Sequence, residues 1–326
     1  MDEIRIGSLI SNQPGVGRGW LKVADHPDGS PMEIPVVVVR GARPGKTLWL
    51  HGCVHGNEYC GTKIIHELLN SLDERSMMGT VVALPILNIT AFQRSQRMSP
   101  FEGYNGGDLN RCFPGQPDGS LTQQIAYHVF RHLKQYADVL VDFHTAMTPD
   151  VRWALYSDVS GEVGSAAEAI ARAFGYYNTL AAPPDILAGS AMMTAAQLGI
   201  PGFIVEAGGK GAAFNRHTIL DGAERMRNVL RRLGILAGEV IHYGNIAKFS
   251  NFAWITASRG GLFQPAVRCG DLLKEGMVIG NYFDCWGNPT GTAQSRHVGT
   301  VLAIHPGPLM GNGETLVHIG LNARES

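Results

Sequence analysis

The spacing of apolar residues divides most of the chain into short strand-like runs and longer helix-like segments. Apolar runs that stop at Gly, Pro or polar residues predict strands, whereas apolar residues three and four positions apart predict helices with one buried face. Strands are expected at residues 18–24, 34–39, 47–50, 80–86, 139–144 and 203–206. Helices are expected around residues 64–72, 121–133, 161–174, 190–198 and 226–233.

The predicted strands and helices alternate along the chain, which is typical of an α/β fold. We expect a mixed, largely parallel sheet with helices on both faces. The first two strands are joined by the turn-rich residues 25–31 and should form a hairpin. Residues 88–119 lack a regular period and are expected to form a long loop.

The pattern changes near residue 242, after which Gly, Pro and short apolar runs alternate without a helical period. We therefore predict an α/β domain over residues 1–241 and a small all-β domain over residues 242–326. Residues 265–280 resemble the turns of biotinyl and lipoyl carrier domains, which favours a barrel-sandwich-like architecture, but no Lys follows Gly276. A structural lid or an oligomerisation module is therefore preferred to a carrier.

Composition excludes several classes of protein. Of 326 residues 44% are hydrophobic and 17% are charged, which is too apolar for a disordered chain. Lys and Arg number 27 against 28 Asp and Glu, so no basic field predicts a nucleic-acid partner. The sequence has no apolar segment long enough to predict a membrane span. Its first residues are acidic and lack the cationic region of a signal peptide, so a cytoplasmic protein is expected. Five scattered Cys without a Cys-x-x-Cys pair indicate neither disulfides nor a thiolate zinc site.

Polar residues that could carry chemistry follow three of the predicted strands. In open α/β sheets, ligands bind at the carboxyl ends of the strands. His55 and Glu58 follow the strand at 47–50, His144 ends the strand at 139–144, and Glu206 ends the strand at 203–206. An imidazole and a carboxylate three positions apart can converge, and a distant His would complete a tripod. Two His and one Glu with water form a catalytic zinc set.

Four motifs occur in order along residues 45–210: His55-Gly-Asn-Glu58, Asp108-Leu-Asn-Arg-Cys-Phe-Pro-Gly115, Asp142-Phe-His144 and Glu206-Ala-Gly-Gly209. In this order they resemble the succinylglutamate desuccinylase/aspartoacylase family of the zinc carboxypeptidase superfamily. That family usually carries a β domain after its catalytic domain, which agrees with residues 242–326. The resemblance implies that residues 1–241 form a zinc-dependent catalytic domain.

The resemblance also implies roles for single residues. His55, Glu58 and His144 would hold one Zn²⁺, and Glu206 would be the general base that acts on an activated water. Asp142 lies two residues before His144, hence on the same strand face, and could accept the free N–H of a metal-bound imidazole. A simple strand-end cap is the alternative for Asp142.

The loop at 88–119 supplies the cations that the resemblance implies. Arg111, with Asn110 beside it, would grip a substrate carboxylate through its planar fork. Arg97 would polarise the scissile carbonyl, although Arg94 lies three residues away and is an alternative. A surface ion pair is the plain alternative for Arg97 and Arg111.

The resemblance implies a zinc-dependent deacylase that hydrolyses the amide bond of a small N-acyl amino acid. The alternatives are a metallocarboxypeptidase that acts on peptide C-termini and a metal-binding relative without turnover. No Gly-x-Ser-x-Gly motif supports a serine esterase. A homo-oligomer is compatible with the sequence. We expect the β domain to restrict the site to small substrates and its Trp and Phe residues to be core, although Tyr243 or Tyr282 could reach a cleft between domains. His51 could neighbour the site, but we expect it to be structural, as we do His318.

Overall fold

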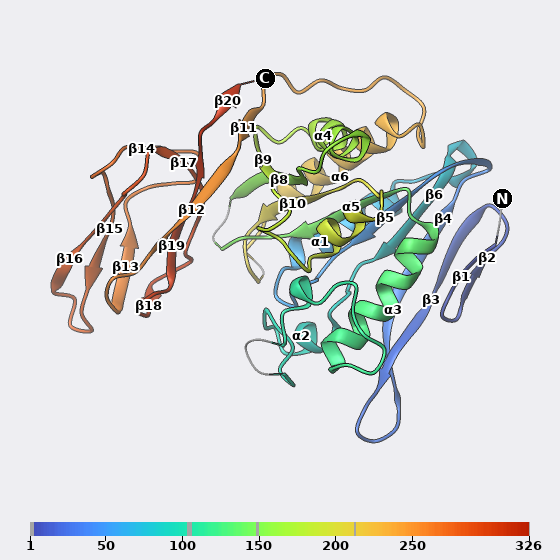
Figure 1. Ribbon diagram of the computed structural model, residues 1–326, viewed down its shortest axis with the longest axis horizontal. Coiled ribbons are helices and arrows are strands. Elements are labelled where there is room, and N and C mark those ends of the chain that lie inside the picture. The colour runs from blue at the N-terminus through green and yellow to red at the C-terminus, as the bar shows by residue number, and fades with distance from the viewer. Residues whose placement is uncertain (1–2, 103–105, 148–149, 212, 326) are drawn as a thin grey trace.

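The computed structural model describes residues 3–102, 106–147, 150–211 and 213–325. Within them, a large ten-stranded sheet carries helices on both faces, and two four-stranded sheets form a separate layer beside it (Figure 1). The large sheet has this order of strands: β20 (Arg324–Glu325), β11 (Ala247–Phe249), β9 (Asn178–Ala182), β8 (Val151–Ser157), β10 (Gly202–Gly208), β7 (Val139–His144), β5 (Arg43–His51), β6 (Met78–Leu84), β4 (Pro31–Arg40), β3 (Gly15–Asp25). A short hairpin, β1 (Ile4–Ile6) and β2 (Leu9–Ser11), lies beside β3.

The large sheet is mixed. Strands β10, β7, β5 and β6 run parallel at its centre, whereas β8 is antiparallel to β10, and β3 and β4 form the expected hairpin at one edge. The residues of β7 are all buried, as expected for a parallel strand covered on both faces. The predicted mixed α/β architecture is therefore confirmed.

Five helices cover the large sheet. Buried residues of α1 (Tyr59–Asn70), α4 (Glu162–Phe174) and α6 (Arg216–Arg232) share one hydrophobic cluster with the sheet, and those of α3 (Leu121–Tyr136) and α5 (Ala191–Gln197) share another on the opposite face. Helix α3 begins with a capping box of Ser120 and Gln123. No helix in the described ranges is long and apolar enough to span a membrane.

Two parts of this fold differ from the expectation. Strand β8, between β7 and α4, and strand β9, between α4 and α5, were not predicted, and neither were β1 and β2. The loop at 88–119 also contains short helices, α2 (Ile89–Gln93) and the 3₁₀ turn η2 (Leu109–Arg111), and a further 3₁₀ turn, η1 (Glu74–Ser76), precedes β6. Residues 103–105 of that loop lie outside the described residues.

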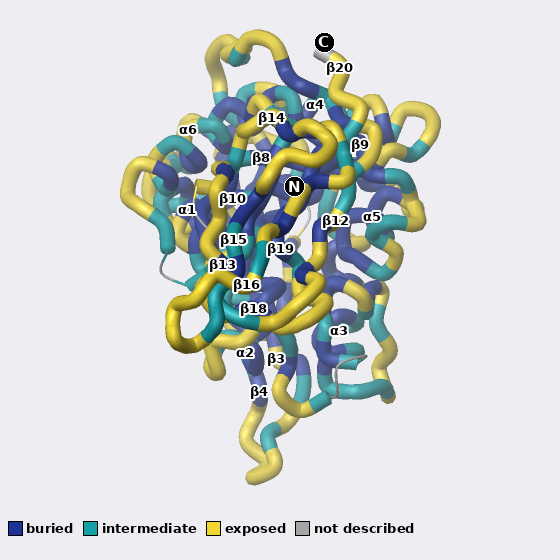
Figure 2. Tube along the Cα trace, turned by 90° about the vertical axis from the view of Figure 1, so that its left-hand side faces the viewer, coloured by how far each residue is buried: buried dark blue, intermediate teal, exposed yellow. Residues whose placement is uncertain are grey.

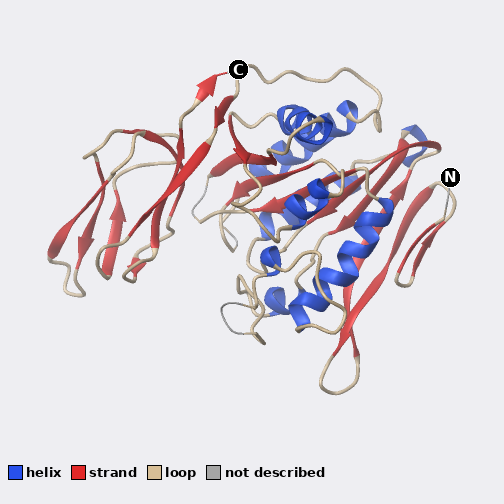
Figure 3. Cartoon of the chain, viewed as in Figure 1, coloured by secondary structure: helices blue, strands red, loops and turns tan. Residues whose placement is uncertain are grey.

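The C-terminal β domain packs two four-stranded sheets around a third hydrophobic cluster. In the described residues 250–325, Figure 3 shows strands and loops only. The first sheet is β12 (Asn251–Thr256), β19 (Thr315–Leu321), β17 (Gly299–Ile304), β14 (Leu272–Leu273), and the second is β16 (Pro289–Gln294), β15 (Val278–Phe283), β13 (Gly261–Pro265), β18 (Leu309–Met310). Strands β11 and β20 flank this domain in sequence and pair within the large sheet.

The β domain contacts the large sheet near β8 and β9. Leu302 and Ala303 of β17 belong to the same hydrophobic cluster as Trp153 and Leu155 of β8. In Figure 2, strands β8 and β10 are largely buried, whereas the outer turns of the β domain are exposed. The β domain therefore packs against β8, the neighbour of the motif-bearing strand β10.

Candidate metal centre and active site

The polar residues at three strand ends become neighbours because the strands pair in register. His51 of β5 is the partner of Asp142 of β7, and His144 is the partner of Glu206 of β10. Partners in register point to the same face of the sheet. This pairing brings together side chains that lie 62 residues or more apart in the sequence.

The loop between β5 and α1 carries His55 and Glu58 and is fixed on both sides. Asn88 donates from its side chain to the carbonyl of Val54 at 3.2 Å and also caps α2. Gly56 packs so closely on α2 that a Cβ atom there would lie 2.1 Å from the carbonyl carbon of Ala91. Only glycine allows this approach, so the sequence His55-Gly-Asn-Glu58 gives the loop its shape.

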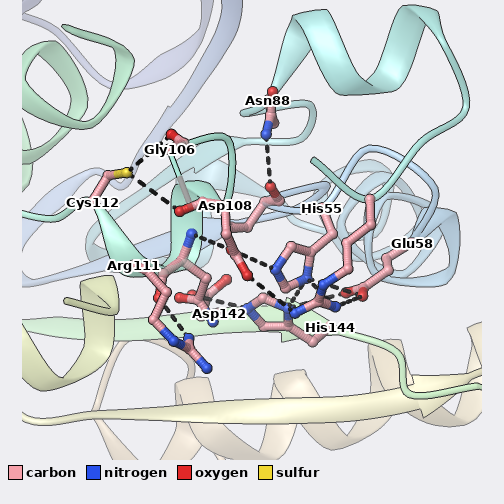
Figure 4. Close-up of polar contacts among 12 residues, drawn as sticks. His55, Glu58, Asn88, Gly106, Asp108, Arg111, Cys112, Asp142 and His144 are labelled. Carbon is pink, nitrogen blue, oxygen red and sulfur yellow. Dashed lines mark hydrogen bonds and ion pairs between the residues drawn. The ribbon is translucent and has the colours of Figure 1, made fainter. Parts of the chain in front are cut away.

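His55, Glu58 and His144 form a buried cluster of three possible metal ligands, all within 4.8 Å of one another. The Nδ1 atom of His55 lies 2.9 Å from Glu58 Oε1, and the Nδ1 atom of His144 lies 3.0 Å from Glu58 Oε2 (Figure 4). The two Nδ1 atoms lie 3.0 Å from each other. Ligands about 2.0–2.1 Å from a tetrahedral zinc ion would be roughly 3.3 Å apart, so the cluster has nearly that spacing.

The outer nitrogen of each imidazole faces an aspartate. Nε2 of His55 lies 3.1 Å from Asp108 Oδ1, and Nε2 of His144 lies 3.3 Å from Asp142 Oδ2. A carboxylate can accept a hydrogen bond from the ring N–H that faces it, and this tautomer leaves the lone pair on the opposite nitrogen. Both Nδ1 lone pairs then face each other and the Glu58 carboxylate, an arrangement that fits a cation between them.

The electrostatics of the cluster also favour a cation. Burial opposes the ionisation of Glu58, but the charges and hydrogen bonds of His55 and His144 outweigh it and hold the pKa of Glu58 well below its usual range. Burial likewise disfavours the charged form of His144, yet Asp142 and Glu58 together raise the pKa of His144 well above its usual range. With both imidazoles neutral, the carboxylates around the two rings therefore leave an excess of negative charge.

Glu206 lines the same cavity beside the cluster without belonging to it. Its Oε2 atom is buried and has no hydrogen-bond partner among the described residues. Burial raises the pKa of Glu206 to about 7. A carboxylate with such a pKa, next to a potential metal centre, can exchange protons near neutral pH.

The structure brings Arg97 to the site and leaves Arg94 exposed on α2's C-terminal side. One guanidinium nitrogen of Arg97 donates to Glu58 at 3.2 Å, and the other lies 3.5 Å from Asp108. Between the two arginines that the sequence left open, the geometry favours Arg97.

Asn110 and Arg111 lie on η2 and also line the cavity. Arg111 donates to the carbonyl of Asn110 at 2.7 Å, and its charge is one of those that lower the pKa of Asp108, but it forms no close ion pair with a carboxylate of the described residues. Asn110 is buried, and its Oδ1 atom has no hydrogen-bond partner in the same ranges. The exposed guanidinium of Arg111 can bind a carboxylate, and the amide N–H groups of Asn110 could donate to the same group, whereas its Oδ1 atom can only accept.

The structure adds residues that the sequence interpretation missed. Asp108 lies in one of the four motifs, but its contact with His55 spans 53 positions and has no local signature. Lys210 also lines the cavity, and burial lowers its pKa. The signal for Lys210 in the sequence was only its position four residues after Glu206, directly after the fourth motif.

The β domain contributes to the cavity, which corrects two expectations. Phe252, Trp254 and His318 line it, although the aromatic residues of this segment were expected to be core and His318 to be structural. The error arises because these side chains face a space that forms only when the two parts of the chain pack together. His51 is buried, and its Nε2 accepts from Trp49 at 2.8 Å, as a structural residue would.

The family of the chain follows from comparison with known proteins. Residues 44–233 match the family described as the succinylglutamate desuccinylase/aspartoacylase catalytic domain. The chain is also 30% identical over 285 residues to N-alpha-acetyl-L-2,4-diaminobutyric acid deacetylase of Halomonas elongata, covering 83% of this chain and 80% of that protein. The chain therefore belongs to the succinylglutamate desuccinylase/aspartoacylase family, as its motifs suggested.

Solved structures share the whole fold, including the β domain. The product-bound ectoine utilization protein EutE (DoeB) from Ruegeria pomeroyi has a TM-score of 0.84 and 26% identity, covering 95% of this chain and 97% of that chain. A succinylglutamate desuccinylase/aspartoacylase from Rhodobacter sphaeroides has a TM-score of 0.83 and 24% identity, covering 97% of each chain. Because the identity to the Rhodobacter sphaeroides protein is only 24%, that comparison supports the fold and not the function.

Proposed function

We propose that the protein is a zinc-dependent deacylase that hydrolyses the amide bond of a small N-acyl amino acid. The observation that carries the proposal is the inward-facing pair of Nδ1 atoms of His55 and His144, 3.0 Å apart, with Glu58 beside both. Imidazole and carboxylate ligands suit zinc, and three protein ligands leave a coordination position open for chemistry.

The proposed chemistry divides between the metal and the residues of the chain. When bound, zinc polarises a carbonyl oxygen and lowers the pKa of a coordinated water toward about 7. Glu206 takes a proton from the attacking water at its carboxylate and passes it to the nitrogen of the leaving amine. Arg97 donates hydrogen bonds to the carbonyl oxygen as negative charge develops there.

Substrate recognition in this proposal depends on charge. Arg111 and Asn110 bind the carboxylate of the amino acid, and Lys210 adds a second positive charge to the same cavity. The relative from Halomonas elongata is named a deacetylase of an N-acetyl amino acid. We therefore propose acetyl as the first acyl group to test.

Two features support this function over the alternatives drawn from the sequence. The cavity has a volume of about 640 Å³ and is lined partly by the β domain, which suits a small molecule better than an extended peptide. Glu206 carries a buried, unpartnered oxygen beside the cluster, and a metal-binding relative without turnover would not need one.

The test is to supply the purified chain with zinc and to measure amine release from N-acetyl amino acids and from C-terminal residues of longer peptides. The proposal predicts hydrolysis of the N-acetyl amino acids that is lost on chelation and restored by zinc. Faster cleavage of the peptides would instead assign a carboxypeptidase. No hydrolysis of either class by zinc-loaded protein would contradict the proposal.

A further inference from the structure

The wall of the cavity continues beyond Glu206 in the direction away from the metal cluster. Across the sheet, Glu206 is the register partner of His144 on one side and of Trp153 on the other. These side chains share one face, in the order His144, Glu206, Trp153. In the next row Leu155 pairs with Leu180, and both line the cavity. The cavity therefore changes from charged to apolar at Glu206.

The β domain completes this apolar part with aromatic rings. Trp254 and His318 are cross-strand partners whose rings stack in parallel, 4.0 Å apart and inclined by 4°. The ring of His318 is nearly perpendicular to the rings of Trp153 and Phe252, whose centroids lie 5.1 Å and 4.8 Å from its own. We name this region the aromatic arm and define it by six residues that all line the cavity: Trp153, Leu155, Leu180, Phe252, Trp254 and His318.

The aromatic arm contains buried polar atoms that the chain does not satisfy. His318 is 3% exposed and Trp153 is 4% exposed. Neither ring nitrogen of His318, nor Nε1 of Trp153, has a hydrogen-bond partner in the described part of the chain. Buried polar groups are normally paired with protein, water or a ligand. The three atoms are solvent-inaccessible and form no hydrogen bond with a charged side chain of the described residues, so this wall of the cavity is uncharged.

No charged side chain of the described residues contributes to the pKa of His318, whose ring contacts the three other aromatic rings of the aromatic arm. Burial alone lowers the pKa of His318 to about 3, with no contribution from a charged side chain, so the imidazole is neutral. The nearest acid of the β domain that lines the cavity, Glu314, is exposed and accepts from the backbone of Gly311 at 2.7 Å. One face of Trp254 is already covered by His318, which reduces its value for binding a cation.

We propose that the aromatic arm is the specificity subsite for an uncharged side chain on the amino acid released by hydrolysis. This inference rests on the proposed function, because it uses Glu206 as the group that protonates the leaving amine. The amine lies at Glu206, so the part of the substrate beyond Glu206 belongs to the amino acid and not to the acyl group. An ammonium group on the side chain would lose hydration among these rings and would lie in a cavity to which Lys210 already adds a positive charge.

The experiment compares two substrates of equal size with the zinc-loaded protein. N-acetylnorvaline and Nα-acetyl-2,4-diaminobutyrate differ by a terminal methyl in place of an ammonium. We expect kcat/KM to be at least about tenfold higher for the norvaline compound, the scale on which an apolar pocket discriminates. The variant Trp254→Ala should reduce this ratio by about tenfold. Trp286→Ala is the control, since Trp286 is 83% exposed in the same domain.

The outcomes separate this proposal from the proposed function. Equal or faster cleavage of the diaminobutyrate compound, or an unchanged ratio in Trp254→Ala, would overturn the subsite while leaving the deacylase intact. The subsite would also be overturned if Trp254→Ala changed the relative rates for different acyl groups attached to glycine but not those for different amino-acid side chains. If neither substrate is cleaved, calorimetric titration with N-acetylnorvaline decides: weaker binding to Trp254→Ala supports the subsite, and equal binding to both proteins overturns it.

Discussion

The Nδ1 atoms of His55 and His144 lie 3.0 Å apart, while the Nε2 atom of each ring faces an aspartate. Asp108 and Asp142 thus fix the orientation of the two rings by facing their Nε2 atoms, on the side away from the Nδ1 atoms. This arrangement explains why the carboxylates in the four motifs are as important to the site as the ligands themselves. It also makes the account testable at residues that would not touch a metal.

Replacing Asp108 by Asn should weaken the metal site without unfolding the protein. The amide keeps the size of the carboxylate but removes the charge that fixes the imidazole of His55. Loss of such a partner typically reduces metal affinity about 10- to 100-fold. Competition of zinc with a chelating dye would measure the affinity. Asp118→Asn, an exposed change in the same loop, is the control, and equal affinity in both variants would refute the role of Asp108.

Glu206→Gln should retain zinc and lose most turnover. The amide cannot take a proton from water, and removal of a general base costs about 10²- to 10⁴-fold in rate. Metal content and kcat measured on one preparation would separate binding from chemistry. The matched control is Glu239→Gln, which is exposed and should keep normal rates. A Glu206→Gln variant with nearly normal kcat would exclude Glu206 as the base.

The rate should rise with pH and then become constant. Burial raises the pKa of Glu206 to about 7, while the positive charge of His144 acts in the opposite direction. A bound dication would lower this pKa further, so the midpoint is expected at or below about pH 7. Below the midpoint the protonated carboxyl is inactive, and kcat/KM should fall about tenfold per pH unit. A rate that increases on acidification, at constant metal content, would contradict this.

Arg111→Ala should chiefly weaken the binding of carboxylate-bearing substrates. Its guanidinium lines the cavity and forms no close ion pair with a carboxylate of the described residues. Loss of a charged hydrogen bond corresponds to an increase in KM of about tenfold or more. Arg94→Ala, a nearby exposed arginine, provides the comparison. An unchanged KM in Arg111→Ala would remove Arg111 from the substrate site.

Much of this fold could be predicted from the sequence, because long periodic helices and apolar strands carry local signals. The strand at 139–144 and the helix that begins at Leu121 agree with the structure at their predicted positions. Strands β8 and β9 could not be predicted in this way. Strand β8 pairs with β10, and β9 pairs with β8, so their places in the sheet depend on contacts with distant parts of the chain.

The candidate site shows the same division. Four site residues could be predicted from the sequence: His55, Glu58, His144 and Glu206. Each lies at or after the end of a predicted strand, and these ends lie at the same edge of the sheet. Trp254 and His318 could not be predicted as site residues, because their position depends on how the β domain packs against the large sheet. No local pattern distinguishes an aromatic residue in a core from one that lines a space between domains.

The most direct test of the central claim is elemental metal analysis of the purified protein beside His144→Ala. The account predicts about one zinc per chain in the wild type and loss of that zinc in the variant, because His144 is one of three ligands. His66→Ala, an exposed histidine on α1, is the control and should retain zinc. Absence of metal in the wild type after zinc addition and dialysis, or full retention in His144→Ala, would contradict the account.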